Sequence, residues 1–144
     1  MGKRVLVVED DRFIGEVIAA SLLQQGYLVD TVPDGRRAWQ YLKRHRPSLI
    51  LLDLSLPNED GLTICRKLRG MPATASTPVV VVSAMSQPPT VQAVMDAGAN
   101  DFIKKPFDID DLVLAARTYV RQATVRRKPL RSPFLSQLPI RRPA

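Results

Sequence analysis

The sequence predicts an α/β protein built on a doubly wound, five-stranded parallel sheet. Short apolar runs of four to six residues recur along the chain and are typical of strands buried on both faces. Between them lie segments whose apolar residues recur at helical spacing, so that strand and helix alternate five times. The expected strands are Val5–Val8, Tyr27–Val32, Leu49–Leu52, Val79–Val82 and Asp101–Lys104.

Each expected helix is indicated by an apolar stripe and by residues suited to its ends. In the first helix Ile14, Ile18 and Leu22 share one face, and Gly26 is placed to end it. Asp108 is placed to cap the last helix. The residues that indicate the five helices lie within Ile14–Leu22, Ala38–Leu42, Gly61–Arg69, Thr90–Ala97 and Ile109–Val120.

Composition and charge narrow the class of protein. A chain of 144 residues suits one domain with a short tail, and a hydrophobic content of 45% excludes wholesale disorder. A single cysteine and the lack of a Cys/His cluster exclude a disulfide scaffold and a structural zinc site. The net charge of +7 suggests an anionic partner, but residues 123–144 hold six of the 21 bases and none of the 14 acids. We therefore expect a nearly neutral domain at 1–122 and a basic, proline-rich tail at 123–144.

Targeting signals are not evident. The first apolar run ends at Glu9 after four residues, which is too short for a signal peptide. The longer apolar stretch of about 18 residues that a spanning helix needs is also missing. We expect a cytoplasmic protein without a membrane partner.

Polar, reactive side chains follow the expected strands. Glu9 and Asp10 follow the first strand, Asp53 the third, Ser83 the fourth and Lys105 the fifth. Parallel sheets bind ligands beyond the carboxyl ends of their strands, so we expect these groups to meet in one shallow cleft. Three close carboxylates must share a proton or a cation, and oxygen ligands favour Mg²⁺. An ionised Asp53 there is a candidate nucleophile toward phosphorus, with Lys105 and Ser83 stabilising the phosphoryl oxygens.

Four segments around these strand ends form an ordered set. They are Val7-Val8-Glu9-Asp10-Asp11, Leu51-Leu52-Asp53-Leu54-Ser55-Leu56-Pro57 with Asp60-Gly61, Val82-Ser83-Ala84, and Phe102-Ile103-Lys104-Lys105-Pro106-Phe107. Together they resemble the receiver domains of bacterial two-component response regulators over residues 3–122. The resemblance implies a flavodoxin-like fold with strand order 2-1-3-4-5.

The resemblance also implies a role for each site residue. Asp53 is implied as the phosphoacceptor, assisted by Lys105 and Ser83, and Pro106 as a cis proline. Ser83 and Phe102 are implied as the switch pair. A Mg²⁺ ion, or Mn²⁺ in its place, is implied as the cofactor, with Glu9, Asp10, Asp53 and the backbone carbonyl of Ser55 as its ligands.

The implied function is signalling. A sensor histidine kinase or a phosphotransfer protein is expected to phosphorylate Asp53. The phosphoryl group then alters the face formed by the fourth helix, fifth strand and fifth helix, which an unknown output protein recognises. Homodimerisation on phosphorylation is a further expectation. Beyond assisting its own phosphotransfer and slow dephosphorylation, the chain is not expected to be an enzyme.

Other classes fit the sequence less well. Phosphatases of the haloacid dehalogenase type carry an Asp-x-Asp motif after a strand. Here the residue two positions after Asp53 is Ser55 and not an aspartate. An FMN binder would carry a Ser/Thr/Gly-rich loop where this chain has three acids, and no P-loop is present. His45 lies in no four-helix phosphotransfer pattern, and Cys65 is expected to be buried and inert.

The tail leaves three alternatives open. The first is a linker, or the start of an effector region missing from this sequence. The second is a docking segment, and the third is a segment that contacts nucleic acid. The third is the least favoured, because the tail has few aromatic residues that could stack on bases. An adaptor that acts through this tail, independently of phosphorylation, is the alternative function. The apolar residues of the docking alternative are Phe134, Leu135, Leu138 and Ile140.

Overall fold

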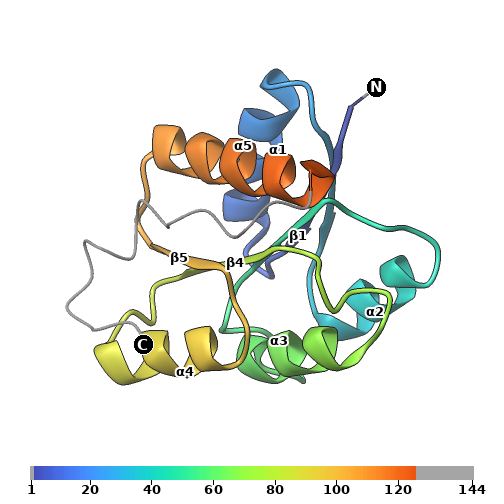
Figure 1. Ribbon diagram of the computed structural model, residues 1–144. Helices are drawn as coiled ribbons and strands as arrows, with labels where there is room; N and C mark the ends of the chain where they lie inside the picture. The colour runs from blue at the N-terminus through green and yellow to red at the C-terminus, as the bar shows by residue number, and fades with distance from the viewer. Residues whose placement is uncertain (1, 126–144) are drawn as a thin grey trace.

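A computed structural model describes the backbone of residues 2–125 and the side chains of residues 2–121. Five parallel strands form one sheet in the order β2-β1-β3-β4-β5. Helices α1 and α5 cover one face, and α2, α3 and α4 cover the other (Figure 1). The strands are β1 (Arg4–Val8), β2 (Leu28–Val32), β3 (Leu49–Leu52), β4 (Val79–Ser83) and β5 (Asp101–Lys104). The helices are α1 (Arg12–Gln24), α2 (Gly35–Leu42), α3 (Gly61–Gly70), α4 (Pro88–Asp96) and α5 (Ile109–Val125).

The central strands divide their side chains between two apolar clusters. In β1, Val5 and Val7 join the cluster beneath α1 and α5, whereas Leu6 and Val8 join the cluster beneath α2, α3 and α4. All four are at most 1% exposed. Because successive side chains of a strand point to opposite faces, a strand covered on both faces must be apolar throughout. The apolar runs in the sequence are therefore the signature of this three-layer arrangement.

The predicted fold class and strand order are confirmed, and several element boundaries differ from the expected ones by a few residues. Ser83 is the last residue of β4, where it pairs with Lys104 of β5, and does not follow the strand as expected. Helix α4 begins at Pro88 and not near Thr90, because proline is well tolerated in the first helical turn. Helix α5 continues to Val125, beyond the expected domain boundary at 122.

Aspartates begin three of the helices. The side chains of Asp11, Asp34 and Asp60 accept hydrogen bonds from backbone N–H groups in the first turns of α1, α2 and α3. Each satisfies a donor that has no partner within the helix. At the opposite ends, Gly26 and Gly98 follow α1 and α4 with positive φ angles. These caps fix where each loop leaves the sheet.

Strand register places the chemically reactive strand ends side by side. Val8 of β1 pairs with Val32 of β2 and with Leu52 of β3. Immediately beyond, the N–H of Asp53 donates to the carbonyl of Val8 over 3.0 Å. The residues after β1 and β3 are therefore held at the same level of the sheet edge.

Two sets of expectations concern the tail and the membrane. Predictions for residues 126–144, including those for the apolar residues of the tail, lie outside the described part of the chain. Among the described residues, none of the helices is long and apolar enough to cross a bilayer.

Gly61, the first residue of α3, lies against the backbone of the β3–α3 loop. A Cβ atom at this position would lie 2.2 Å from the carbonyl oxygen of Asp53 and 2.8 Å from the Cα of Leu54. The N–H of Gly61 donates to the Leu54 carbonyl over 3.0 Å, which holds the two segments together. Only glycine permits this approach, because the obstructing atoms are backbone and cannot rotate away.

The first prediction compares two glycines of the same helix. Gly61→Ala is expected to lower the free energy of unfolding by about 2 kcal/mol, because the new methyl group overlaps backbone atoms. Gly70→Ala is the control, since a Cβ there meets nothing within 4 Å. It is expected to leave the stability unchanged or raise it by less than about 1 kcal/mol, through the better helix propensity of alanine. Urea denaturation of both variants measures the difference, and equal stabilities would contradict the steric explanation.

Candidate functional site

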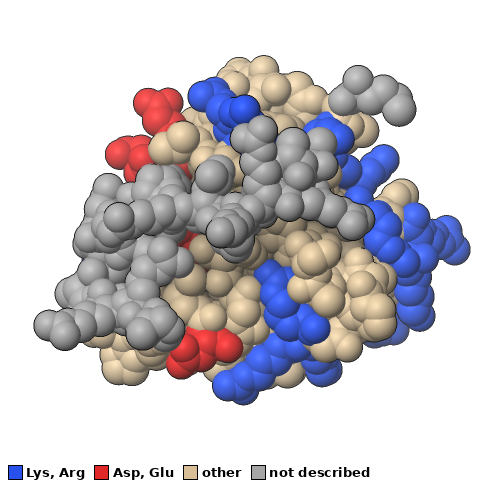
Figure 2. Space-filling model, in the orientation of Figure 1, with Lys and Arg blue, Asp and Glu red and all other residues tan. Residues whose placement is uncertain are grey.

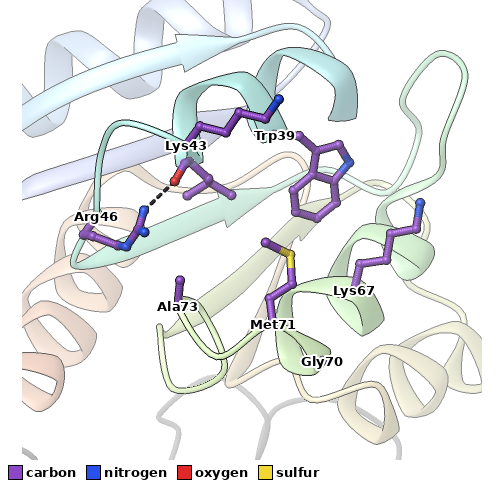
Figure 3. Close-up of a pocket in the computed structure, with 8 residues that line it drawn as sticks. Trp39, Lys43, Arg46, Lys67, Gly70, Met71 and Ala73 are labelled. Carbon is purple, nitrogen blue, oxygen red and sulfur yellow. Dashed lines mark hydrogen bonds between the residues drawn. The ribbon is translucent and has the colours of Figure 1, made fainter.

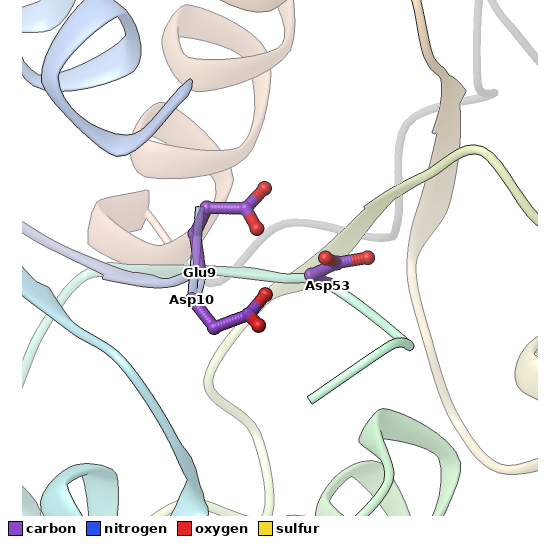
Figure 4. A group of neighbouring side chains, drawn as sticks. All are labelled: Glu9, Asp10 and Asp53. Atoms are coloured by element: carbon purple, nitrogen blue, oxygen red, sulfur yellow. The ribbon is translucent and has the colours of Figure 1, made fainter. Parts of the chain in front are cut away.

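Three carboxylates converge at the carboxyl edge of the sheet (Figure 4). Glu9 and Asp10 directly follow β1, and Asp53 directly follows β3. One carboxylate oxygen from each lies within 4.8 Å of those of the other two. Glu9 and Asp53 are each 6% exposed, whereas Asp10 is open to solvent. The structure thus brings together the three acids that follow these two strands in the sequence.

Lys105 supplies positive charge to the buried pair. Its Nζ donates a 2.5 Å hydrogen bond to Oε1 of Glu9 and lies 3.3 Å from Oδ2 of Asp53. The side chain of Lys105 is 14% exposed. Its backbone N–H donates to the carbonyl of Ser83, so the end of β4 positions the lysine that follows β5. Three separate strands therefore meet through one ammonium group.

Burial and charge act in opposite directions on this pair. Burial raises the pKa of Glu9 above its ordinary value and the nearby Asp53 adds to the rise, while the hydrogen bond from Lys105 offsets it only in part. Burial lowers the pKa of Lys105, but the hydrogen bond to Glu9 and the charges of both carboxylates outweigh it, so the pKa is raised. Lys105 is consequently cationic at neutral pH.

Two serines border the carboxylates. The N–H of Ser55 donates to Oδ1 of Asp53 over 3.3 Å, and its hydroxyl lies 3.1 Å from the sulfur of Met85. Ser83 is fully buried at the end of β4, and its hydroxyl oxygen accepts a 3.1 Å hydrogen bond from the N–H of Met85. Met85 thus contacts both serines from the loop that follows β4.

The remaining predicted residues lie on β5 and after it. Phe102 is 1% exposed and belongs to the apolar cluster beneath α2, α3 and α4. Its ring is therefore inside the core and outside the carboxylate cluster. The peptide bond between Lys105 and Pro106 is cis.

The donor set of this cluster fits Mg²⁺. All three acids offer oxygen ligands, which this hard cation prefers. Three carboxylates and one ammonium leave two negative charges when all are ionised, and a divalent cation neutralises them. Asp10 is exposed, so an ion bound here keeps access to water, as Mg²⁺ usually does.

Sequence reasoning missed three contributions to this site. In the sequence Asp11 is one more acid beside the pair Glu9 and Asp10. In the structure its side chain caps α1, and its backbone N–H donates to Oε2 of Glu9. An aspartate just before a helical stripe is a capping signal that could have shown this role. The need for glycine at position 61 depends on a contact with the backbone of Asp53. The link between Ser55 and Met85 depends on the approach of two loops that are distant in the sequence. No local pattern signals either one.

Comparison with known proteins identifies the family. Residues 5–117 match the family model of the response regulator receiver domain. The response regulator MprA of Mycolicibacterium vanbaalenii is 37% identical over 124 residues, covering 86% of this chain and 53% of that protein. The chain belongs to the response regulator receiver domain family of two-component systems. It spans about half the length of the curated relatives it matches.

Solved receiver domains share the fold. The BeF₃-activated N-terminal receiver domain of Klebsiella pneumoniae RstA aligns with a TM-score of 0.78 and 34% identity, covering 83% of this chain and all of that one. The receiver domain of the sensor histidine kinase PA1611 of Pseudomonas aeruginosa, solved with a magnesium ion in its active-site cleft, aligns with a TM-score of 0.77 and 30% identity. That alignment covers 84% of this chain and 99% of the other.

The second prediction separates two neighbouring aspartates by their roles. Asp10→Asn is expected to weaken Mg²⁺ binding about tenfold or more, because it removes a charged oxygen from the cluster. Asp11→Asn is expected to change the affinity less than about threefold, because asparagine still caps the helix. Isothermal titration of each variant with MgCl₂ measures both affinities. Equal losses in the two variants would show that general surface charge, and not this cluster, holds the ion.

Proposed function

We propose that this chain is the phosphorylated switch domain of a two-component pathway, with Asp53 as its phosphoacceptor. The observation that carries the proposal is the meeting of Glu9, Asp53 and Lys105, from three different strand ends, beside the exposed Asp10. The phosphodonor is a phosphohistidine on a sensor kinase or phosphotransfer protein. This assignment follows from membership of the family and from the chemistry of the cluster.

Asp53 acts as the nucleophile. A carboxylate oxygen attacks the phosphorus, an O–P bond forms as the N–P bond of the donor histidine breaks, and the imidazole nitrogen keeps the bonding electron pair. The 3.3 Å hydrogen bond from the Ser55 N–H restrains the orientation of the Asp53 carboxylate. Burial of Asp53 to 6% exposure limits competition from water at the attacking atom.

Lys105 and Ser83 support the transferred group. The ammonium of Lys105 already lies 3.3 Å from Asp53, close enough to neutralise charge on the phosphoryl oxygens. The hydroxyl of Ser83 accepts a bond from the N–H of Met85, and as a hydroxyl it can also donate its own hydrogen to an oxygen of the phosphoryl group.

Glu9, Asp10 and Asp53, with the backbone carbonyl of Ser55, are proposed to hold Mg²⁺. When bound, the ion supplies positive charge that offsets the repulsion between the carboxylates and the incoming phosphoryl oxygens. With Glu9 serving as a ligand of the cation, Lys105, which now donates to Glu9, would be available to the phosphoryl group.

Phosphorylation is proposed to select one of two packings around Ser83 and Phe102. The inward position of Phe102, 1% exposed, is one of these packings. In the other, the ring would leave the core and alter the face formed by α4, β5 and α5. Recruitment of Ser83 by the phosphoryl group favours the inward packing, so that an output protein or a second copy binds the resulting face.

The third prediction tests the phosphoacceptor. Incubation with acetyl phosphate and Mg²⁺ is expected to add one phosphoryl group to the chain, as measured by intact-mass spectrometry. Asp53→Asn is expected to abolish the addition, because an amide is a poor nucleophile. Asp60→Asn, on the same loop, should be labelled as well as the unaltered chain, since asparagine keeps the cap of α3. An unlabelled chain, or labelling that survives Asp53→Asn, would contradict the proposal.

The fourth prediction tests the switch. Phosphorylation is expected to change the hydrogen–deuterium exchange of residues 84–107, and Ser83→Ala is expected to lose most of that change while remaining phosphorylated. The reason is that alanine cannot donate to the phosphoryl oxygens. Ser86→Ala, three residues further on, serves as the control. If Ser83→Ala and Ser86→Ala respond alike, Ser83 is not part of the switch.

A further inference from the structure

The described surface of the chain has an apolar groove with a basic rim (Figure 3), and none of the three clustered carboxylates lines it. It lies between α2 and the end of α3 and has a volume of about 630 Å³. Trp39 and Met71 point toward one another across it, from the two opposing elements. The residues that line it are Trp39, Leu42, Lys43, Arg46, Lys67, Gly70, Met71 and Ala73.

The groove exposes apolar surface that the fold itself does not cover. Met71 is 38% exposed, and Trp39 is half-buried. The indole N–H of Trp39 donates to Oε1 of Glu59, which fixes the ring at the wall of the groove. Trp, Met and Arg are among the residues enriched in protein interfaces. A rigid aromatic wall facing a flexible thioether is suited to receiving an apolar side chain from outside.

Positive charge surrounds this apolar floor. Residues 35–46 contain five Lys and Arg and no acid, although the whole of 1–122 is nearly neutral. Lys and Arg accordingly gather over the side of the molecule where α2 lies (Figure 2). On the rim, Lys67 is paired with Glu59. Among the described side chains, Lys43 and Arg46 have no acidic ion-pair partner.

We propose that this groove binds an acidic, amphipathic helix of a partner protein. Apolar side chains of that helix fill the space between Trp39 and Met71, and its carboxylates pair with Lys43 and Arg46. The lining runs from Trp39 in α2 to Arg46, beyond the end of that helix, and a bound helix would present its anchors to it at positions i, i+4 and i+7. The site is separate from the face formed by α4, β5 and α5.

Charge and shape argue against other occupants. The tail at 123–144 carries six bases and no acid, so the rim repels it. A nucleic-acid duplex offers charged phosphates but no apolar side chains for the floor of the groove. A membrane surface is bound by apolar side chains that protrude, whereas these line a hollow.

The groove carries its own reporter, because Trp39 is the only tryptophan of the chain. The probe is a synthetic helical peptide without tryptophan, with leucine at positions i, i+4 and i+7 and glutamate on its other face. Titration into the full chain is expected to change the Trp39 emission in a saturable way. A peptide with lysine in place of each glutamate, and one with serine in place of each leucine, should leave the emission unchanged.

Two variants test the two parts of the groove. Lys43→Glu is expected to weaken peptide binding about tenfold, by replacing attraction with repulsion. The control Arg117→Glu, the same charge change on α5, should alter the affinity less than about twofold. Met71→Gln is expected to weaken binding about fivefold or more, and because Met71 is exposed the variant should fold normally.

Four outcomes would overturn the proposal. The first is an acidic peptide that gives no saturable change, and the second is binding that Lys43→Glu leaves intact. The third is a response of Trp39 to duplex DNA or to vesicles of anionic lipid but not to the peptide. The fourth is a chain lacking residues 126–144 that no longer binds the peptide, since the bases of the tail, and not the groove, would then hold the glutamates.

Discussion

The structure depends on the compensation of two nearly buried carboxylates by one ammonium group. Glu9 and Asp53 are each 6% exposed, and Lys105 contacts both. Buried carboxylates of like charge destabilise a fold unless a counter-ion lies between them. The lysine therefore ties the ends of β1, β3 and β5 together, and it leaves a site with surplus negative charge. Stability and reactivity arise from the same three side chains.

The segment that follows Asp53 connects this cluster to the far side of α3. Gly61 lies against the carbonyl of Asp53, and Glu59 from the same loop holds both Trp39 and Lys67. The loop after Asp53 thus contacts the α2–α3 groove through the hydrogen bonds of Glu59 with Trp39 and Lys67. The acidic site and the basic groove are consequently both contacted by the loop between Asp53 and Gly61.

Much of the fold and the carboxylate cluster could be predicted because both follow from short-range patterns. Apolar runs such as Leu49–Leu52 indicate strands buried on both faces, and residues that follow parallel strands meet at one edge. The ends of strands are harder to predict because they depend on pairing with a neighbouring strand. Ser83, for example, belongs to β4 through its pairing with Lys104 of β5. The count of charges along the sequence directed attention to the basic tail, whereas the structure shows that bases of the domain itself gather along α2 and around the groove beside it.

The sequence by itself determined the parallel α/β class, the order of its elements and the identity of the acids, serine and lysine at the strand ends. The spacing of apolar residues, the capping residues and the family signatures are all local properties of the chain, so they can be recognised without coordinates. Only the tertiary structure decided that Lys105 lies closer to Glu9 than to Asp53, that position 61 requires glycine, and that Trp39 and Met71 form a groove. Each of these depends on distances between segments far apart in the sequence, and helix and loop packing sets those distances.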